Sequence, residues 1–399
     1  MQKLLPVILE ERMQINLWLY IYHMRVIHQL FQEIKNIPGW KTKRKLVAIA
    51  VDDYGNVRLD SKKAYEAIHS KNPVKEEQRF DRFDTLETRE DLEMLYEILA
   101  SVKDQHGNPA IFTPFALPCN IDFERLRSEG FEKYQYELLP ETFKKLEANQ
   151  PIAYRGTWDL WNEGMKKGLM LPQFHGREHF NLKVFEEKLA KKDPALLLSL
   201  KNRSLANIGP SDNPFVRWTA AFSFWDPAKD IEKFPEILQD GMESFKKVYG
   251  YKPSIFTPPA NAFPNSLERF LVSLGIIAVN RAFFESAHVG FGKYKRRMST
   301  LRLNKEINMI HIVRNVVFEP TCSNINHVEK ALSQIETAFK WNKPAIISSH
   351  RVNFCGHIDA NNRKTGLTEL KKLLSKIVNK WPDVEFKSIK SLTAMMTNG

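Results

Sequence analysis

Lys45 to Gly55 reads KLVAIAVDDYG, an apolar run that ends abruptly in two acidic residues, a tyrosine and a glycine. Apolar runs without alternation are typical of strands that are buried on both faces, as in a parallel sheet. Neighbouring side chains of a regular strand point to opposite faces, so Asp52 and Asp53 can serve one site only if the chain turns there, which Gly55 helps to permit. Because α/β proteins bind ligands at the carboxyl ends of their strands, the two aspartates are candidate site residues, with a solvated turn as the alternative.

Segments with the patterns of strands and helices alternate through the rest of the chain. The strand candidates are short apolar segments at residues 110–115, 168–174, 254–257, 276–279, 309–313, 345–348 and 384–386. Between them apolar residues recur at helical spacing, and Thr88 to Asp91 has the pattern of a helix start. This alternation predicts βα units around a parallel sheet that is curled into a barrel. With 399 residues and no convincing linker, one domain with insertions is the simplest interpretation.

Two histidines follow the third strand candidate. His175 and His179 are four residues apart, a spacing that places two side chains on one face of a helix, where they can share a metal ion. Because they follow a strand, we expect them at the same rim of the sheet as Asp53. Two imidazoles and one carboxylate leave an open position for water. The same ligands also suit nonheme iron oxygenases, and a pair of surface or capping histidines is the structural alternative.

A further histidine ends a strand candidate in the second half of the chain. His350 stands in Ile346-Ile-Ser-Ser-His350, directly after an apolar segment. A histidine at such a position is commonly a packed or capping residue. Its predicted place on the same rim makes it a candidate general acid.

The composition is that of an ordinary globular protein, with 43% hydrophobic and 27% charged residues. Lys and Arg number 59 against 47 for Asp and Glu, a net charge of +12, which favours anionic partners without selecting one. There is no zinc-finger spacing, ribonucleoprotein aromatic motif or arginine-rich arm, so we expect no nucleic-acid partner. The three widely separated cysteines argue against a disulfide framework and favour a reducing compartment.

The start of the chain lacks the features of a signal peptide. Glu10 and Glu11 follow a short apolar run directly, and no small-residue cleavage site follows. Charged and polar residues interrupt the apolar stretch 15–31, so it is not expected to span a bilayer, and we expect a cytoplasmic protein. Residues 17–34 and the lysines after them have the pattern of an amphipathic element with a basic flank. Such an element either packs on the protein or makes peripheral contact with a membrane.

In this order, these residues resemble the motifs of the polysaccharide deacetylase superfamily, which includes the nodulation-type chitooligosaccharide deacetylases. The strand that ends in Asp52-Asp53, the pair His175 and His179, and the strand that ends in His350 resemble its first, second and last motifs. The loop Phe256-Thr-Pro-Pro259 is similar to its Arg-x-Pro loop. The wording PQFHGREHFN (172–181) and PAIISSHRVNF (344–354) resembles an atypical bacterial branch.

The resemblance covers residues 45–393 and implies a fold, a metal and a reaction. The implied fold is a distorted (β/α) barrel of about seven parallel strands, which residues 45–399 would form after an N-terminal helical extension (1–44). Asp53, His175 and His179 would hold a divalent metal ion, usually zinc in the family. Asp52 would be the catalytic base and His350 the general acid in the removal of an acetyl group from an acetylated sugar or polysaccharide. Both amide and ester substrates suit this chemistry, and the oligomeric state stays open.

The sequence departs from the family pattern in several places. Thr257 stands where the family has an arginine that orients the catalytic aspartate, and Asn261 stands where it has a glycine. The candidates for the missing positive charge are Arg281, Arg177 and Arg351. The chain also has a long insertion, from Phe123 to Trp161, whose aromatic residues either line a sugar cleft or belong to the core; they are Phe131, Tyr134, Tyr136, Trp158 and Trp161.

These departures leave two further hypotheses beside the deacetylase. The loss of the orienting arginine would suit a catalytically inactive glycan-binding protein that keeps the fold. A different metalloenzyme that uses the same three ligands is the other alternative.

Overall fold

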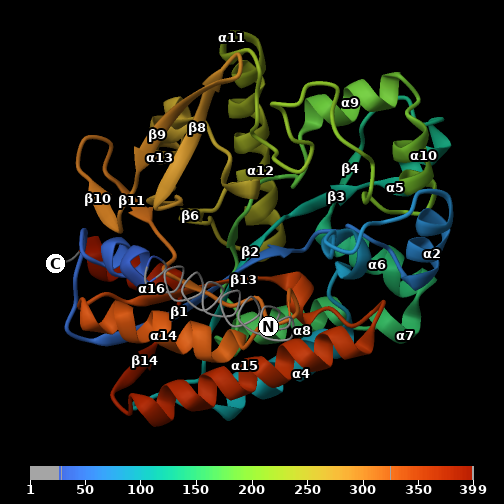
Figure 1. Ribbon diagram of the computed structural model, residues 1–399. Coiled ribbons are helices and arrows are strands. Elements are labelled where there is room, and N and C mark those ends of the chain that lie inside the picture. The colour runs from blue at the N-terminus through green and yellow to red at the C-terminus, as the bar shows by residue number, and fades with distance from the viewer. Residues whose placement is uncertain (1–26, 28, 324, 398–399) are drawn as a thin grey trace, which may run out of the picture.

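The structure, a computed structural model, describes residues 27, 29–323 and 325–397 (Figure 1). Residues 29–36 are helical and precede the first strand of the sheet. Most of the predicted N-terminal extension, and with it most of the amphipathic element at residues 17–34, lies outside the described residues. Among the described helices, none combines the length and the apolar character that crossing a membrane requires.

A ten-stranded, mainly parallel sheet forms the centre of the molecule. Its strands are β1 (Lys45–Tyr54), β2 (Phe112–Ala116), β5 (Gln173–Phe174), β6 (Ile255–Phe256), β7 (Ala278–Asn280), β10 (Arg302–Asn304), β11 (Met309–Ile312), β12 (Val316–Val317), β13 (Ala345–His350) and β14 (Val384–Phe386). The strand order is β10-β11-β7-β6-β5-β2-β1-β13-β12, and β14 pairs with the start of β1. Only the pair of β10 and β11 is antiparallel among these ladders.

The sheet is curled, and a short stretch of chain connects strands that lie near its two ends. β11 lies near one end of the strand order and β12 at the other, yet Ile312 and Val316 are four residues apart and at most about 14 Å apart in space. Residues 313–315 therefore join the two sides, and β11 and β12 together occupy one of seven positions around a distorted barrel. No hydrogen-bonded ladder of the described strands closes this barrel, since β11 pairs with β7 and β12 with β13. The predicted α/β fold is confirmed.

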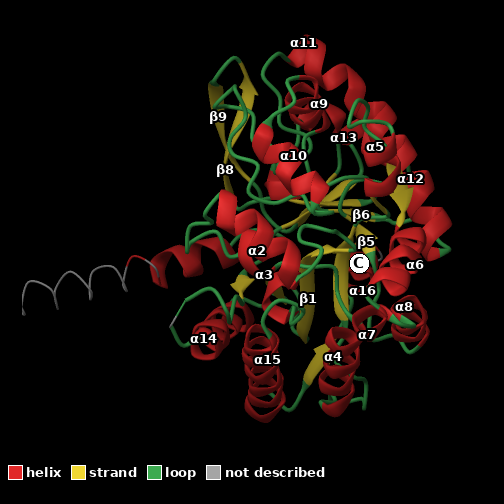
Figure 2. Ribbon diagram, turned by 90° about the vertical axis from the view of Figure 1, so that its right-hand side faces the viewer, coloured by secondary structure: helices red, strands yellow, loops and turns green. Residues whose placement is uncertain are grey.

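Helices surround the barrel, and α14, α15 and α4 lie side by side along one side of it (Figure 2). The α-helices are α2 (Lys62–Lys71), α3 (Phe80–Phe83), α4 (Arg89–Ser101), α5 (Phe123–Ser128), α6 (Leu139–Asn149), α7 (Pro151–Tyr154), α8 (Thr157–Lys166), α9 (Leu182–Ala190), α10 (Pro194–Lys201), α11 (Pro227–Asp230), α12 (Phe234–Tyr249), α13 (Glu268–Ser273), α14 (His327–Lys340), α15 (Ala360–Lys380) and α16 (Ile389–Thr397). The 3-10 helices are η1 (Ile231–Lys233), η2 (Pro259–Asn261), η3 (Asn265–Leu267) and η4 (Arg351–Phe354). Two antiparallel hairpins, β3 (Cys119–Ile121) with β4 (Tyr136–Leu138) and β8 (Phe284–Gly290) with β9 (Lys293–Met298), lie outside the sheet.

Local sequence explains the best-predicted elements. Helix α4 begins with a capping box, in which the Thr88 side chain accepts from the backbone of Asp91 and the Asp91 side chain accepts from that of Thr88. Nine of the ten residues of β1 are buried, because neighbouring strands and helices cover both of its faces. Because β1 lies between β2 and β13 in the strand order, its carboxyl end is flanked by other strand ends at the rim of the sheet.

A buried ionic cluster lies beneath this rim. Arg351, which follows β13, donates to Asp84 at 2.8 Å and to Glu87 at 3.0 Å, and all three side chains are at most 2% exposed. Glu87 also accepts from the indole of Trp161 at 2.9 Å. The cluster ties η4 to the segment before α4 and to α8.

Replacing Arg351 with Met should lower the free energy of unfolding by about 3–5 kcal/mol, because two buried carboxylates lose their cation. Chemical denaturation followed by circular dichroism measures this difference. Arg125→Met, which breaks an exposed ion pair with Glu129, is the matched control and should leave the stability almost unchanged. Equal losses in the two variants would contradict the role of the cluster.

Candidate metal centre

Asp53 occupies a bulge at the carboxyl end of β1. The register between β1 and β2 shifts between Val51 and Tyr54, and the backbone of Asp53 is left-handed, with a φ of 77°. This conformation is uncommon for a residue with a side chain and costs about 1–3 kcal/mol. It allows two consecutive side chains, those of Asp52 and Asp53, to line the same cavity. The turn on which a shared site depends is present, and it is centred on Asp53 itself.

His175 and His179 lie in a loop between a strand and a helix. β5 ends at Phe174, and α9 begins only at Leu182. The prediction that the two histidines share one face of a helix is therefore wrong. Gly176 has a φ of 112°, and a Cβ there would lie 3.0 Å from a backbone carbonyl oxygen, so the folded-back loop needs a glycine. This fold of the loop, rather than helical periodicity, brings the imidazoles together.

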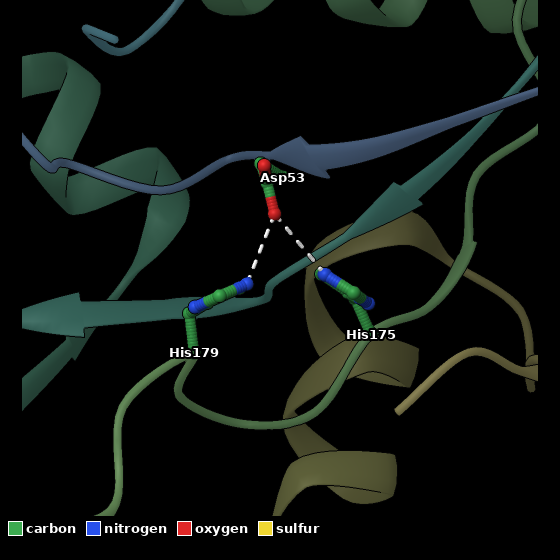
Figure 3. A group of neighbouring side chains, drawn as sticks. All are labelled: Asp53, His175 and His179. Carbon is green, nitrogen blue, oxygen red and sulfur yellow. Dashed lines mark hydrogen bonds and ion pairs between the residues drawn. The ribbon is translucent and has the colours of Figure 1, made fainter. Parts of the chain in front are cut away.

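Asp53 lies between the two imidazoles (Figure 3). Its Oδ1 is 3.3 Å from Nε2 of His175 and 3.0 Å from Nε2 of His179. One ligand atom from each of the three residues lies within 4.8 Å of the others. Ligand atoms that surround a tetrahedral zinc ion at 2.0–2.1 Å are about 3.3 Å apart. The donor set and its spacing therefore fit a divalent metal ion.

Hydrogen bonds and burial set the protonation of these ligands. Nδ1 of His175 lies 2.7 Å from the carbonyl oxygen of Thr257, which can only accept, so Nδ1 carries a hydrogen and Nε2 is the ring nitrogen that faces Asp53 and a metal ion. Burial lowers the pKa of His179 against the opposing effect of Asp53. Burial raises the pKa of Asp53, but the charge of His179 and hydrogen bonds from both histidines hold it well below its usual value. A neutral imidazole and an ionised carboxylate are the forms that bind metal ions.

Asp52 is held in a bidentate ion pair with Arg314. Nη1 of Arg314 lies 2.7 Å from Oδ2 of Asp52, and Nη2 lies 2.7 Å from Oδ1. Burial raises the pKa of Asp52, but the charge and the hydrogen bonds of Arg314 more than offset this and lower it. Nη2 also donates to the hydroxyl of Thr257 at 3.0 Å. Arg314 thus supplies positive charge beside Thr257, the position at which the polysaccharide deacetylase motif has an arginine.

None of the three arginines proposed from the sequence for this role contacts Asp52. Each is paired with carboxylates elsewhere: Arg281 with Glu268, Arg177 with Glu178 and Asp240, and Arg351 with Asp84 and Glu87. An arginine that already pairs with a buried carboxylate is not available to Asp52, because separating the first pair would leave a buried charge without a partner. The prediction is corrected to Arg314, from residues 313–315, which join the two sides of the sheet.

His350 lies beside Asp52, at the end of the neighbouring strand β13. Its Nε2 lies 4.0 Å from Oδ2 of Asp52, and its Nδ1 lies 2.6 Å from Oε1 of Glu319. Burial lowers the pKa of His350, but Glu319 outweighs this effect and raises it to about 9. Glu319 is oriented in turn by an ion pair with Arg79 and by a hydrogen bond from Asn353 at 2.8 Å. At neutral pH, His350 is therefore protonated while Asp52 is ionised.

All five residues proposed from the sequence line one cavity of ≈ 410 Å³; they are Asp52, Asp53, His175, His179 and His350. Two aromatic residues line it as well. The guanidinium of Arg58 lies 5.6 Å from the ring of Phe80 and 5.2 Å from that of Trp218, and it pairs with Asp81 at 2.7 Å. The side chains that line the cavity are a mixture of aromatic, acidic and basic groups, which suits a polar ligand.

Four of the five aromatic residues of the insertion pack in or against the core, and Tyr136 is exposed. Trp161 is fully buried, and Tyr134 donates to the buried Glu178 at 2.8 Å. Phe131, Tyr134 and Trp158 pack against the hydrophobic core. None of the five aromatic residues named above lines the cavity of the candidate metal centre. The alternative of a sugar cleft built from this insertion is therefore not supported.

Sequence reasoning missed Arg314, Glu319 and Trp218. Arg314 directly follows the strand candidate at residues 309–313. His350 was selected because it ends a strand candidate, and the same argument would have identified Arg314. Glu319 follows β12, which has only two residues and no pattern of its own. Trp218 lies in a long irregular segment without periodicity, and nothing local marks it.

No protein-family model and no curated protein matches the chain. Among solved structures, the chain is similar to a Mycobacterium smegmatis protein provisionally assigned as a polysaccharide deacetylase, with a TM-score of 0.44, 10% identity, and coverage of 90% of this chain and 93% of that one. It is also similar to the allantoinase Puue (TM-score 0.41, 10% identity, 88% and 89% coverage). A third likeness is to the peptidoglycan deacetylase PdaC from Bacillus subtilis (TM-score 0.34, 10% identity, 89% and 93% coverage).

Deacetylases, to which the motifs pointed, are thus among the structures that the chain resembles. The TM-scores and identities are too low to transfer an activity, and the other proteins include an allantoinase. We therefore base the functional proposal on the chain's own residues.

The ligand set leads to a direct expectation about metal content. Purified protein should bind about one divalent metal ion per chain, and His175→Ala should lose most of it, because only two ligands remain. Elemental analysis after dialysis against excess metal measures both. His106→Ala is the control, since His106 is exposed and its ring pairs only with Glu385 among the described residues. Equal metal content in all three proteins would exclude this site.

Proposed function

We propose that residues 45–399 form a metal-dependent hydrolase that removes an acetyl group from an acetylated sugar or polysaccharide. One observation carries the proposal: Asp52, held by Arg314, and His350, held by Glu319, lie side by side in the cavity that also contains a three-ligand metal set. Two titratable groups whose environments push their pKa values apart are the usual arrangement of a base and an acid.

Asp53, His175 and His179 would hold the metal, with zinc favoured by one oxygen and two nitrogen donors. A bound divalent ion supplies Lewis acidity and makes water a usable nucleophile near neutral pH. The hydrogen bond from His175 to the Thr257 carbonyl fixes which imidazole nitrogen is offered to it.

Asp52 would take the proton from the attacking water. Its two oxygens both accept from Arg314, so the carboxylate keeps one orientation and stays ionised in a buried place. His350, held by Glu319, would then protonate the departing amine or alkoxide of the sugar. Asp52 and His350 are register partners at the ends of the neighbouring strands β1 and β13, so the proposed base and acid lie side by side and both line the cavity.

The presence of Arg314 also bears on the alternative of an inactive glycan-binding protein. That hypothesis rested on the missing arginine at Thr257. Because Arg314 bonds both Asp52 and Thr257, the positive charge is supplied from the connection between β11 and β12, and the reason for expecting inactivity is removed.

Acetate release tests the proposal. Wild-type protein should release acetate from an N-acetylated chitooligosaccharide or an O-acetylated xylooligosaccharide, lose this activity with a chelator and regain it with zinc. Asp53→Ala should abolish both activity and metal binding. Asp52→Asn should keep the metal and lower kcat by about 10²–10⁴-fold, the usual contribution of a general base.

These variants separate the roles of the two aspartates. Metal loss in Asp52→Asn would show that it is a ligand rather than the base. Acetate release that a chelator leaves unchanged would contradict the proposed mechanism. Oxygen consumption by iron-loaded protein, without acetate release, would favour the different metalloenzyme.

The pH dependence of kcat/KM tests the role of His350. A general acid must be protonated, so activity should fall as pH rises through the pKa of His350, about 9. Glu319→Gln removes the charge that raises this pKa, and the basic limb should move to lower pH by about one unit or more. Steady-state rates from pH 5 to 10 measure the shift.

Glu77→Gln is the matched control for this profile. Glu77 lines the same cavity and forms no ion pair with His350. Its substitution should leave the basic limb in place. An unchanged limb in Glu319→Gln, or the same shift in both variants, would contradict the assignment of His350 as the acid.

A further inference from the structure

A second cavity, of ≈ 540 Å³, adjoins the candidate metal centre. Ala260 and Asn261 line both cavities. The segment at residues 215–219 also borders both: Phe215 and Arg217 line the second cavity, and Trp218 and Thr219 line the first. A ligand with several linked units can therefore occupy both cavities at once.

The hairpin of β8 and β9, which lies outside the central sheet (Figures 1 and 2), contributes lining residues to the second cavity. The rings of Phe215 and Tyr294, which are 40% and 53% exposed, line it. The imidazole of His288 lies between them, 5.1 Å from the Tyr294 ring and nearly parallel to the Phe215 ring. These rings offer flat apolar faces beside polar groups, as ligand cavities commonly do.

Two arginines give this cavity its charge. Arg217 and Arg297 both line it, and neither forms an ion pair with a carboxylate among the described residues. Arg217 donates to the carbonyl oxygen of Ala260 at 3.3 Å, which leaves most of its donors free for a ligand. Glu285 is the one carboxylate among the described lining residues; it is the cross-strand partner of Arg297 and lies 3.9 Å from Arg281.

The exposed side of the hairpin adds to the positive charge. Strand β9 reads Lys-Tyr-Lys-Arg-Arg-Met, and its residues 293, 295 and 296 are exposed and basic. Unpaired guanidinium groups beside aromatic rings favour carboxylates and phosphates, which they bind with two parallel hydrogen bonds. A neutral sugar would leave these donors without a charged partner.

We propose that the second cavity binds an anionic sugar unit, carrying a carboxylate or a phosphate, next to the acetylated unit at the metal centre. The inference rests on the proposed function and adds to it the substrate class, an acidic glycan of at least two linked units. Arg217 and Arg297 bind the anionic group, and Phe215 and Tyr294 contact the sugar ring.

Binding of an acidic oligosaccharide without acetyl groups tests the inference apart from catalysis. Calorimetry with hexagalacturonate as the carboxylate probe and glucose 1-phosphate as the phosphate probe should give a measurable Kd with the full-length wild-type protein. Cellohexaose is the neutral comparison and should bind at least tenfold more weakly than the better of the two anions. The tighter anion identifies the source of the negative charge.

Arg217→Gln and Arg297→Gln should each raise the Kd of the better anion about tenfold, because each removes a charge-assisted hydrogen bond. Lys295→Gln is the matched control: it removes the same charge from the same hairpin outside the cavity, and its Kd should change less than twofold. Circular dichroism checks that all three variants fold.

Absence of binding by both anions would overturn the inference, as would equal binding of cellohexaose. An equal loss in Lys295→Gln would also overturn it, because that result reports general attraction to a basic surface. These probes carry no acetyl group, so the binding measurement is independent of the acetate assay. Specific anion binding, combined with no acetate release from the acetylated oligosaccharides named above, would contradict the proposed function and leave the second binding site supported. Acetate release without specific anion binding would support the proposed function and contradict the second binding site.

Discussion

Two consecutive carboxylates share one cavity at the end of a single buried strand, and most of the site follows from that constraint. An ordinary strand would send Asp52 and Asp53 to opposite faces. The left-handed backbone at Asp53 removes this alternation and brings both negative charges into a buried place. Such charges are costly to bury unless cations or hydrogen-bond donors lie beside them. The surrounding elements therefore have to supply positive partners.

Each aspartate receives a different kind of partner. Asp53 lies between two imidazoles and completes a donor set for a divalent ion. Asp52 receives the two donors of Arg314 and faces the imidazolium of His350. This difference separates a ligand from a base although the two residues are neighbours in sequence. The same separation of environments keeps His350 protonated beside an ionised carboxylate.

The curling of the sheet determines where the decisive arginine lies. Residues 313–315 join β11 to β12 and so connect the two sides of the curled sheet. Arg314 is in this connection, and it bridges Asp52 on β1 and Thr257 after β6. A threonine hydroxyl at that position accepts a hydrogen bond from a guanidinium, whereas an arginine there would place a second cation beside the first. The substitution at Thr257 and the position of Arg314 are thus compatible as a pair.

The sequence by itself determined the buried strand, its acidic end, the two histidines, the strand before His350 and the helix that begins at Thr88. Each of these has a local cause: burial on both faces gives an apolar run, a capping box has a fixed spacing, and strand ends meet at one rim. The tertiary structure decided which arginine pairs with Asp52, that Glu319 holds His350, and that His175 and His179 approach through a loop around Gly176. It also decided that most of the insertion's aromatic residues pack in or against the core and that a basic hairpin lines a second cavity. These features join residues far apart in the chain, because a buried charge pairs with whichever partner the curled sheet brings within a few ångströms.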